Sequence, residues 1–148
     1  MIIAFKNKKN MSRLFSANIN NSSLNFWLLL LRIVVACLMI THGLPKLEKV
    51  IAGDFKFADP IGLGARTSLI LTVIAEVLCP VLILIGFATR LATIPLIINM
   101  TVIVFIVVQD FTKKEFPLLY LLIFITLLVT GAGKYSVDGM LSPKGRHR

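Results

Sequence analysis

TSLILTVIAEVLCPVLILIGFA, residues 67–88, is an apolar run with a single charged residue, Glu76, near its middle. Its length matches the roughly 20 residues that a helix needs to cross the hydrocarbon core of a bilayer. An ionised side chain at that depth costs at least a few kcal/mol, so such a carboxylate is usually neutralised, paired or placed in a wet cavity. Glu76 is therefore the first candidate for a functional residue.

Three further apolar stretches of similar kind flank this run, at about 26–44, 91–109 and 116–132, the last being the shortest. Apolar residues make up 57% of the chain, and its mean hydropathy is +0.88. A soluble bundle of very apolar helices would need polar stripes at helical spacing, and these stretches lack them. The sequence predicts an all-α fold, an integral membrane four-helix bundle within a lipid bilayer.

The domain organisation follows from these spans. We expect one transmembrane domain over 24–141, a flexible N-terminal tail over 1–23 and a basic C-terminal tail over 142–148. The alternative for the first span is a cleavable signal peptide, because residues 34–37 (VVAC) imitate a lipoprotein cleavage site. A long preceding region and Arg32 within the apolar core argue against cleavage.

The net charge of +9 would suggest nucleic acid in a soluble protein, but much of it lies in the two tails, which predicts no nucleic-acid partner. An even number of spans places both tails on one side, and the positive-inside rule makes that side the cytoplasm. The prediction is a multi-pass protein of the bacterial inner membrane with both termini cytoplasmic. The two loops expected outside also carry basic residues: Lys46, Lys49, Lys56, Arg66, Lys113 and Lys114.

The first of these outer loops contains the segment 53–64, which alternates apolar residues with polar or turn-forming ones. Such a segment can lie on the membrane surface, with Phe55 and Phe57 as interfacial anchors, and cap the outer mouth of the bundle. A freely mobile loop is the alternative.

Arg32 in the first span is the natural partner to test for Glu76. At about 1.5 Å per residue, Arg32 lies roughly 18 Å below Leu44 and Glu76 roughly 13 to 14 Å below Thr67. These depths predict a direct ion pair that satisfies both charges. The alternative is that Arg32 extends to the cytoplasmic headgroups while Glu76 is protonated.

Two other polar residues belong to the predicted site. His42, at the outer end of the first span, is a candidate proton carrier together with Glu76, because histidine is the usual proton carrier near neutral pH. Asn99 in the third span can donate and accept hydrogen bonds inside the bundle, although helix packing is its plainer role. No second histidine lies in the spans, so a bis-histidine haem or a metal site is not expected. Cys37 and Cys79 stand alone and are expected to be structural thiols.

Several residues together resemble the DoxX family of small four-helix membrane proteins. The resemblance covers roughly Leu30 to Leu141, with Ala132 where a proline is often expected between the two late glycines. Its residues are Arg32, His42-Gly43 with Lys46-Leu47, Glu76, Gly86 with Arg90-Leu91-Ala92, and Gly131-x-Gly133-x-x-Ser136-x-Asp138. The family is named for a subunit associated with a thiosulfate:quinone oxidoreductase, yet most members have no established activity.

The resemblance and the residues leave three functions open, and with them the question of whether the chain is part of an enzyme. In the first, it is the membrane subunit of a redox complex that binds a quinone, with Glu76 and His42 handling protons and Arg32, Glu76, His42 and Asn99 contacting the ligand. Its partner would be a soluble or membrane oxidoreductase subunit. In the second, it is a non-catalytic assembly or anchoring protein. A small-solute pore or carrier is the third, disfavoured by few polar lining residues. A homo-oligomer is compatible with each.

Overall fold

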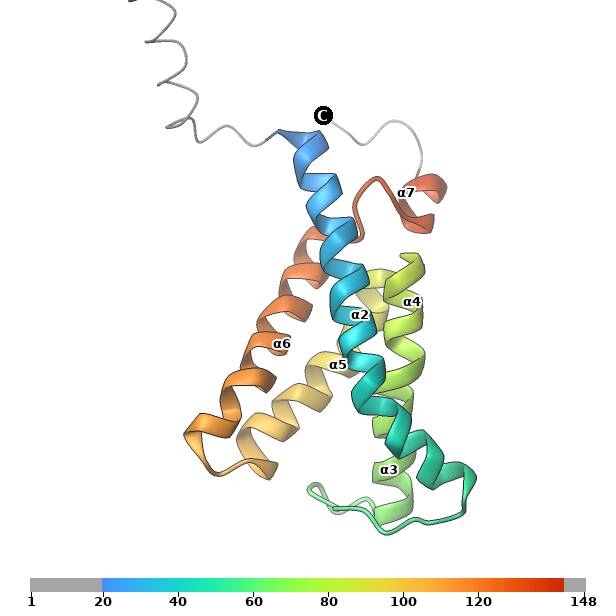
Figure 1. Cartoon of the computed structure of the whole chain (residues 1–148), viewed down its shortest axis with the longest axis vertical. Coiled ribbons are helices and arrows are strands. Elements are labelled where there is room, and N and C mark those ends of the chain that lie inside the picture. Colours follow the sequence, from blue (N-terminus) through green and yellow to red (C-terminus); the bar gives the residue numbers. More distant parts are fainter. Residues whose placement is uncertain (1–19, 143–148) are drawn as a thin grey trace, which may run out of the picture.

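The computed structural model describes residues 20–142, which form a bundle of four long helical rods and one short helix (Figure 1). The first rod is α2 and the fourth is α6, while the second and third each combine α-helix with a π-helical segment. The bounds are α2 Asn21–Ile51, α3 Ala65–Val73, η1 Ile74–Leu78, α4 Cys79–Ile85, α5 Thr89–Val102, η2 Ile103–Val107, α6 Phe111–Thr130 and α7 Val137–Leu141. The all-α fold is confirmed. Of the tails predicted over 1–23 and 142–148, residues 1–19 and 143–148 lie outside the described residues.

Helix α2 is longer at both ends than the predicted span 26–44. At its start, the Asn20 side chain accepts a hydrogen bond from the backbone N–H of Ser22 at 3.0 Å, which caps the helix. Residues 20–23, predicted as part of the flexible tail, are therefore the cap and first turn. At its other end the helix passes through Pro45 and continues to Ile51, because a missing N–H interrupts one bond without ending the helix. This extension places Lys46 on helix α2 rather than in a loop.

The second rod contains the π-helical segment η1 directly before Pro80. The backbone N–H of Cys79 bonds to the carbonyl of Ile74, five residues earlier, which widens the helix at this point. In a regular α-helix the ring of Pro80 would clash with the carbonyl four residues before it, that of Glu76. The wider turn accommodates the proline and sets Glu76 within the irregular segment.

The core lies where α2, α4, α5 and α6 meet (Figure 1). Helix α2 packs along the second rod, and α5 packs on both α4 and α6. The buried core residues are Leu28, Val35, Met39, Cys79, Ile83, Ala92, Leu96, Met100, Phe124 and Leu127. Cys79 is a buried free thiol and Cys37 an exposed one, so neither forms a disulfide.

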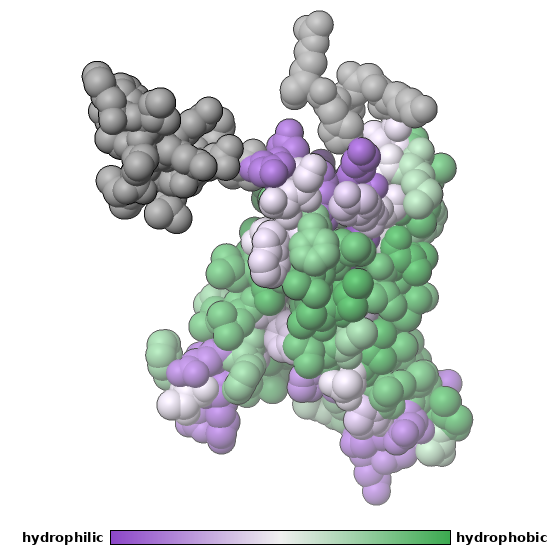
Figure 2. All heavy atoms as spheres, turned by 45° about the horizontal axis from the view of Figure 1, so that its top comes forward, coloured by the Kyte–Doolittle hydropathy of each residue, from purple (hydrophilic) through white to green (hydrophobic). Residues whose placement is uncertain are grey.

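The face of the bundle seen in Figure 2 is apolar around its middle and polar at both ends. Three rods are long and apolar enough to cross a membrane: Asn21–Ile51, Ala65–Ile85 and Thr89–Val107. Helix α6 has charged residues near its start, Lys113, Lys114 and Glu115, so its apolar part is shorter. The chain is a multi-pass membrane bundle, and membrane crossing by the fourth rod stays a prediction.

The segment after α6 folds back and closes the turn between α4 and α5. In that turn Gly86 (φ 71°) and Ala88 (φ 48°) both have left-handed backbones. The carboxylate of Asp138, at the start of α7, accepts hydrogen bonds from the backbone N–H groups of Ala88 at 2.7 Å and Thr89 at 2.9 Å. Asp138 thus supplies the N-terminal cap of α5 from about 50 residues away in the sequence. Helix α7 and the start of α2 lie at the same end of the bundle (Figure 1).

The loop between Ile51 and Ala65 is ordered around Asp59. Its carboxylate accepts hydrogen bonds from the backbone N–H groups of Leu63 at 2.9 Å and Gly64 at 2.8 Å, and from the Ser68 hydroxyl at 2.9 Å. The guanidinium of Arg66 lies over the ring of Phe55, 4.7 Å from its centroid. These contacts tie the loop to the start of α3; its role as a cap of the bundle mouth stays a prediction.

Acidification is expected to loosen this loop through Asp59. The hydrogen bond from Gly64, with smaller contributions from Ser68, Leu63 and Gly62, lowers the pKa of Asp59 against a weaker opposing effect of desolvation. The loop order it gives is therefore complete above the ordinary value of about 3.9 and is lost as the pH falls through the lower folded-state pKa. Hydrogen exchange of the Leu63 and Gly64 amides, corrected for intrinsic rates, should accelerate at low pH. Asp59→Asn should show the faster exchange already at neutral pH, whereas the control Asp54→Asn should not.

Candidate functional site

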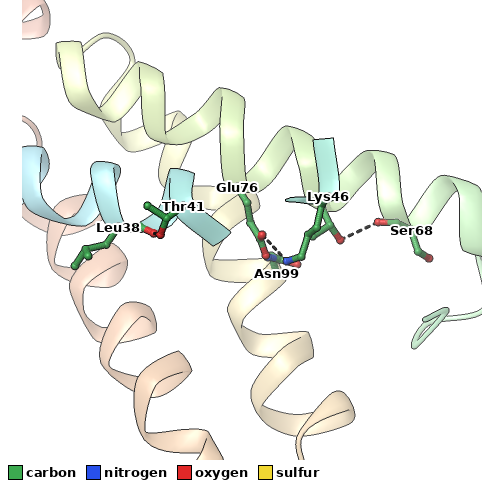
Figure 3. Close-up of polar contacts among 7 residues, drawn as sticks. Leu38, Thr41, Lys46, Ser68, Glu76 and Asn99 are labelled. Atoms are coloured by element: carbon green, nitrogen blue, oxygen red, sulfur yellow. Dashed lines mark hydrogen bonds and ion pairs between the residues drawn. The ribbon is translucent and has the colours of Figure 1, made fainter. Parts of the chain in front are cut away.

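The buried carboxylate of Glu76 is the centre of the candidate site. Glu76 as a whole residue is 1% exposed. The ammonium of Lys46, from α2, forms an ion pair and hydrogen bond with Glu76 Oε2. The side-chain amide of Asn99, from α5, donates to Glu76 Oε1 at 2.9 Å. Each carboxylate oxygen therefore has one partner, and three different rods contribute to the cluster (Figure 3).

Gly43 allows α2 to approach η1 closely enough for this pairing. A Cβ atom at Gly43 would lie 2.6 Å from Val77 Cγ2 and 2.8 Å from the carbonyl oxygen of Glu76, distances at which one helix must move. Lys46 lies about one turn further along α2, on the side that faces Glu76. The lysine side chain is 25% exposed and that of Glu76 is 2% exposed. Lys46 thus bridges the buried carboxylate and the end of the bundle.

A cavity of about 230 Å³ opens beside this pair. The carboxylate and the ammonium form its polar wall, and the exposed residue His42 lies at its edge. The ring of Tyr120, from α6, meets the ring of His42 edge-on, with centroids 6.1 Å apart and planes at 86°. The complete lining is Met39, His42, Lys46, Glu76, Met100, Ile103, Phe116, Pro117 and Tyr120.

The structure brings together three of the four residues predicted for the site. Glu76 and His42 line the cavity, and Asn99 holds the carboxylate. Arg32 does not line the cavity, and the predicted Arg32–Glu76 ion pair is wrong. Arg32 and Lys46 are about 14 residues apart on α2, or roughly 21 Å along the helix axis, so they cannot both reach Glu76. The predicted depths were misleading because they were counted from Leu44, well before the helix ends at Ile51.

Arg32 instead belongs to a second polar cluster, at the opposite end of the bundle. Its fully buried guanidinium donates to the backbone carbonyls of Tyr135 and, at 3.5 Å, Ile83. It therefore fastens the segment before α7 to α4. Within residues 20–142, Arg32 Nε and the hydroxyl of Thr89 are buried without a hydrogen-bond partner. The alternative of Arg32 reaching the headgroups is also wrong, because the side chain is turned into the bundle.

The chemistry that this arrangement allows is that of a polar, charge-neutral pair beside an apolar cavity. Lys46 can donate to an oxygen atom, Glu76 can exchange a proton, and His42 can carry a proton between the cavity and water. The volume of the cavity is below the roughly 300–1,000 Å³ of sites for drug-sized ligands, so the cavity suits one ring rather than a large molecule. Among residues 20–142 no group of three or more His, Cys, Asp or Glu side chains is arranged to hold a metal ion.

Two residues of the site were missed from the sequence. The sequence predicts Lys46 in an outer loop because the apolar stretch of the first span ends at Leu44. Its spacing of four from His42 was the available signal, since residues four apart share a helix face. Tyr120 had no signal beyond an aromatic ring in an apolar span, because its place opposite His42 depends on how α6 packs.

Comparison with known proteins supports the resemblance noted in the sequence. A family model described as DoxX matches residues 27–109, which contain most of α2 together with Glu76 and Asn99. The match ends before α6 and before the glycines and Asp138 that follow it. Searches among curated proteins and among solved structures found no match.

Proposed function

The chain belongs to the DoxX family of membrane proteins, and from this premise we propose that it is the membrane subunit of a quinone-linked redox complex. In this proposal the cavity beside Glu76 binds the ring of a quinone. His42 exchanges protons with water at the cavity edge, while Glu76 takes up and releases a proton beside Lys46. The electrons come from a partner oxidoreductase subunit.

One observation carries the proposal: a carboxylate that is 1% exposed lies beside a cavity lined mainly by aromatic and apolar side chains. A carboxylate with a merely structural role is expected to be packed on all sides, because cavities reduce stability. Small-molecule sites combine apolar walls with a few polar groups, as this cavity does. Arg32, predicted as a fourth ligand contact, is left out because its guanidinium is bound at the other end of the bundle.

The direct test is purification in native lipids, followed by extraction and chromatography of bound lipophilic molecules. We expect a quinone in a molar amount close to that of the protein, together with a co-purifying oxidoreductase. A variant with the cavity filled from the third rod, Ile103→Phe in η2, should retain the fold and lose the quinone. Quinone present equally in both samples would reflect dissolved lipid and contradict the proposal.

The second candidate function is a non-catalytic assembly or anchoring protein. The cluster of Arg32 and Asp138 favours it, since both of these charges bind backbone groups and lock helices together. A stable complex with a partner protein, free of quinone and of redox activity, would support this function instead.

The proposed orientation has both termini in the cytoplasm and the loop around Lys56 outside. In a background with Cys37→Ala and Cys79→Ala, Lys56→Cys should react in intact cells with a thiol reagent that does not cross membranes, because the loop is exposed. Lys134→Cys, at the opposite end of the bundle, should react only after the cells are opened. The reverse pattern would overturn the orientation.

A further inference from the structure

We propose that Lys46 is the residue that contacts the ligand directly, by donating a hydrogen bond to a ring carbonyl oxygen, and that Glu76 is a positioning residue that holds the ammonium in place. This inference rests on the proposed function and assigns a role that neither the sequence prediction nor the family match gives. It also narrows the ligand to a planar ring that carries a hydrogen-bond acceptor.

The hydrogen-bonding capacity left free in the cavity supports this assignment. An ammonium group has three N–H donors, and within residues 20–142 Lys46 uses one of them, toward Glu76. Both oxygens of Glu76 already accept a bond, from Lys46 and from Asn99. The strongest free donor beside the cavity is therefore the lysine ammonium. A carbonyl oxygen, which only accepts, is the matching group on a ligand.

Burial separates the two roles further. The side chain of Glu76 is 2% exposed, whereas that of Lys46 is 25% exposed, so the lysine is the more accessible of the two charged residues that line the cavity. Because the pair is electrically neutral, it favours a neutral carbonyl over an anion, which would leave an excess negative charge in a desolvated site. Charge-assisted donation from the ammonium is also stronger than a bond from a neutral donor.

The wall formed by α6 fits a flat ring. Tyr120 stacks on Phe124, with ring planes 20° apart, and presents its edge to His42. Phe116 lines the same cavity one helical turn earlier, on the same face of α6. Aromatic walls of this kind hold a planar ring through offset and edge-on contacts. A ring between this wall and α2 would bring a carbonyl within reach of Lys46.

The test compares binding of 2-methyl-1,4-naphthoquinone with binding of 2-methylnaphthalene, which has a similar shape and no carbonyl. Full-length protein in lipid nanodiscs is titrated with each probe, and the ratio of the two dissociation constants measures carbonyl recognition. Wild type should favour the quinone about tenfold or more, as expected for a bond from a charged donor. Glu76→Gln should keep part of that preference, because the glutamine amide oxygen can still accept a hydrogen bond from the Lys46 ammonium. The double variant Lys46→Met/Glu76→Gln should lose it, and Lys46→Arg/Glu76→Gln should recover part of it.

The outcomes separate the inference from the proposed function. If wild type has no preference for the quinone, the proposed function fails. If wild type prefers the quinone and the double variant does so equally, Lys46 is not the contact. A preference that is fully lost in Glu76→Gln and not recovered in Lys46→Arg/Glu76→Gln would show that a cation at this position does not recognise the carbonyl, and would overturn the inference. The ratio is insensitive to general loosening of the bundle, because that weakens both probes alike.

Discussion

Lys46→Met is expected to destabilise the bundle by about 3 kcal/mol, whereas Glu76→Gln should cost only about 1 kcal/mol. The asymmetry follows from burial. Without Lys46 the carboxylate stays 1% exposed with Asn99 as its remaining partner, so it must be protonated or remain as an uncompensated buried charge. Without the carboxylate, the lysine is still partly hydrated, because its side chain is 25% exposed. The double variant should be more stable than Lys46→Met, because it removes the stranded charge.

Equilibrium unfolding in detergent, with the two single variants and the double variant, measures this coupling. The matched control is a second double-mutant cycle, with Arg32→Met and Glu76→Gln. Their losses in free energy of unfolding should add within about 0.5 kcal/mol, because the two residues lie at different ends of the bundle. Additive losses for Lys46 and Glu76 would contradict the ion pair, and strong coupling between Arg32 and Glu76 would contradict its location.

Gly86→Ala should have the largest effect of any Gly→Ala substitution. We expect the free energy of unfolding to fall by several kcal/mol and much of the protein to fail to fold. The backbone at Gly86 has φ 71°, which costs an alanine about 1–2 kcal/mol. A Cβ there would also collide with the guanidinium of Arg32 and lie 2.5 Å from Ser136 Cβ. Both groups are buried and fixed by hydrogen bonds, so neither can move aside without breaking the contact between α4 and the segment before α7.

Gly62→Ala is the matched control, because it isolates the backbone term. Gly62 has nearly the same φ, 74°, with no atom within 4 Å of an added Cβ. Gly62→Ala should lower the free energy of unfolding by only the roughly 1–2 kcal/mol that a left-handed backbone costs an alanine. Thermal unfolding and the yield of detergent-extracted monomer report both changes. Equal losses in the two variants would show that the space around Gly86 is not the constraint.

The helical architecture and the identity of the central residue followed from local features of the sequence. Length and hydropathy located the ends of the second and third rods closely, but placed those of the first too near its middle and the start of the fourth too late. The isolated carboxylate indicated the site. Its partner did not follow, because pairing depends on where helices end. Pro45 is locally a helix breaker, yet tertiary packing of α2 against the second rod carries the helix past it and turns Lys46 inward.

The late glycines and Asp138 were part of the family resemblance, but the role of Asp138 came only from the structure. Nothing within the residues 131–138 indicates that the carboxylate caps a helix that begins at Thr89. Such a contact joins positions far apart in the chain, and hydrophobic periodicity carries no information about it. The same limit applies to the cavity, whose walls come from four separate rods.

The cap that Asp138 places on α5 also sets the order in which parts of the bundle assemble during synthesis. The turn at residues 86–89 is synthesised about 50 residues before Asp138, at a time when its two backbone N–H groups have no carboxylate to bind. The second and third rods therefore enter the bilayer with an unfinished connection. Their final angle is fixed only when the C-terminal segment has left the ribosome and Arg32 has bound the Tyr135 carbonyl. Biogenesis of this bundle ends with a closing step at its cytoplasmic end under the proposed orientation, so a chain shortened before Asp138 would insert its helices and still fail to assemble them.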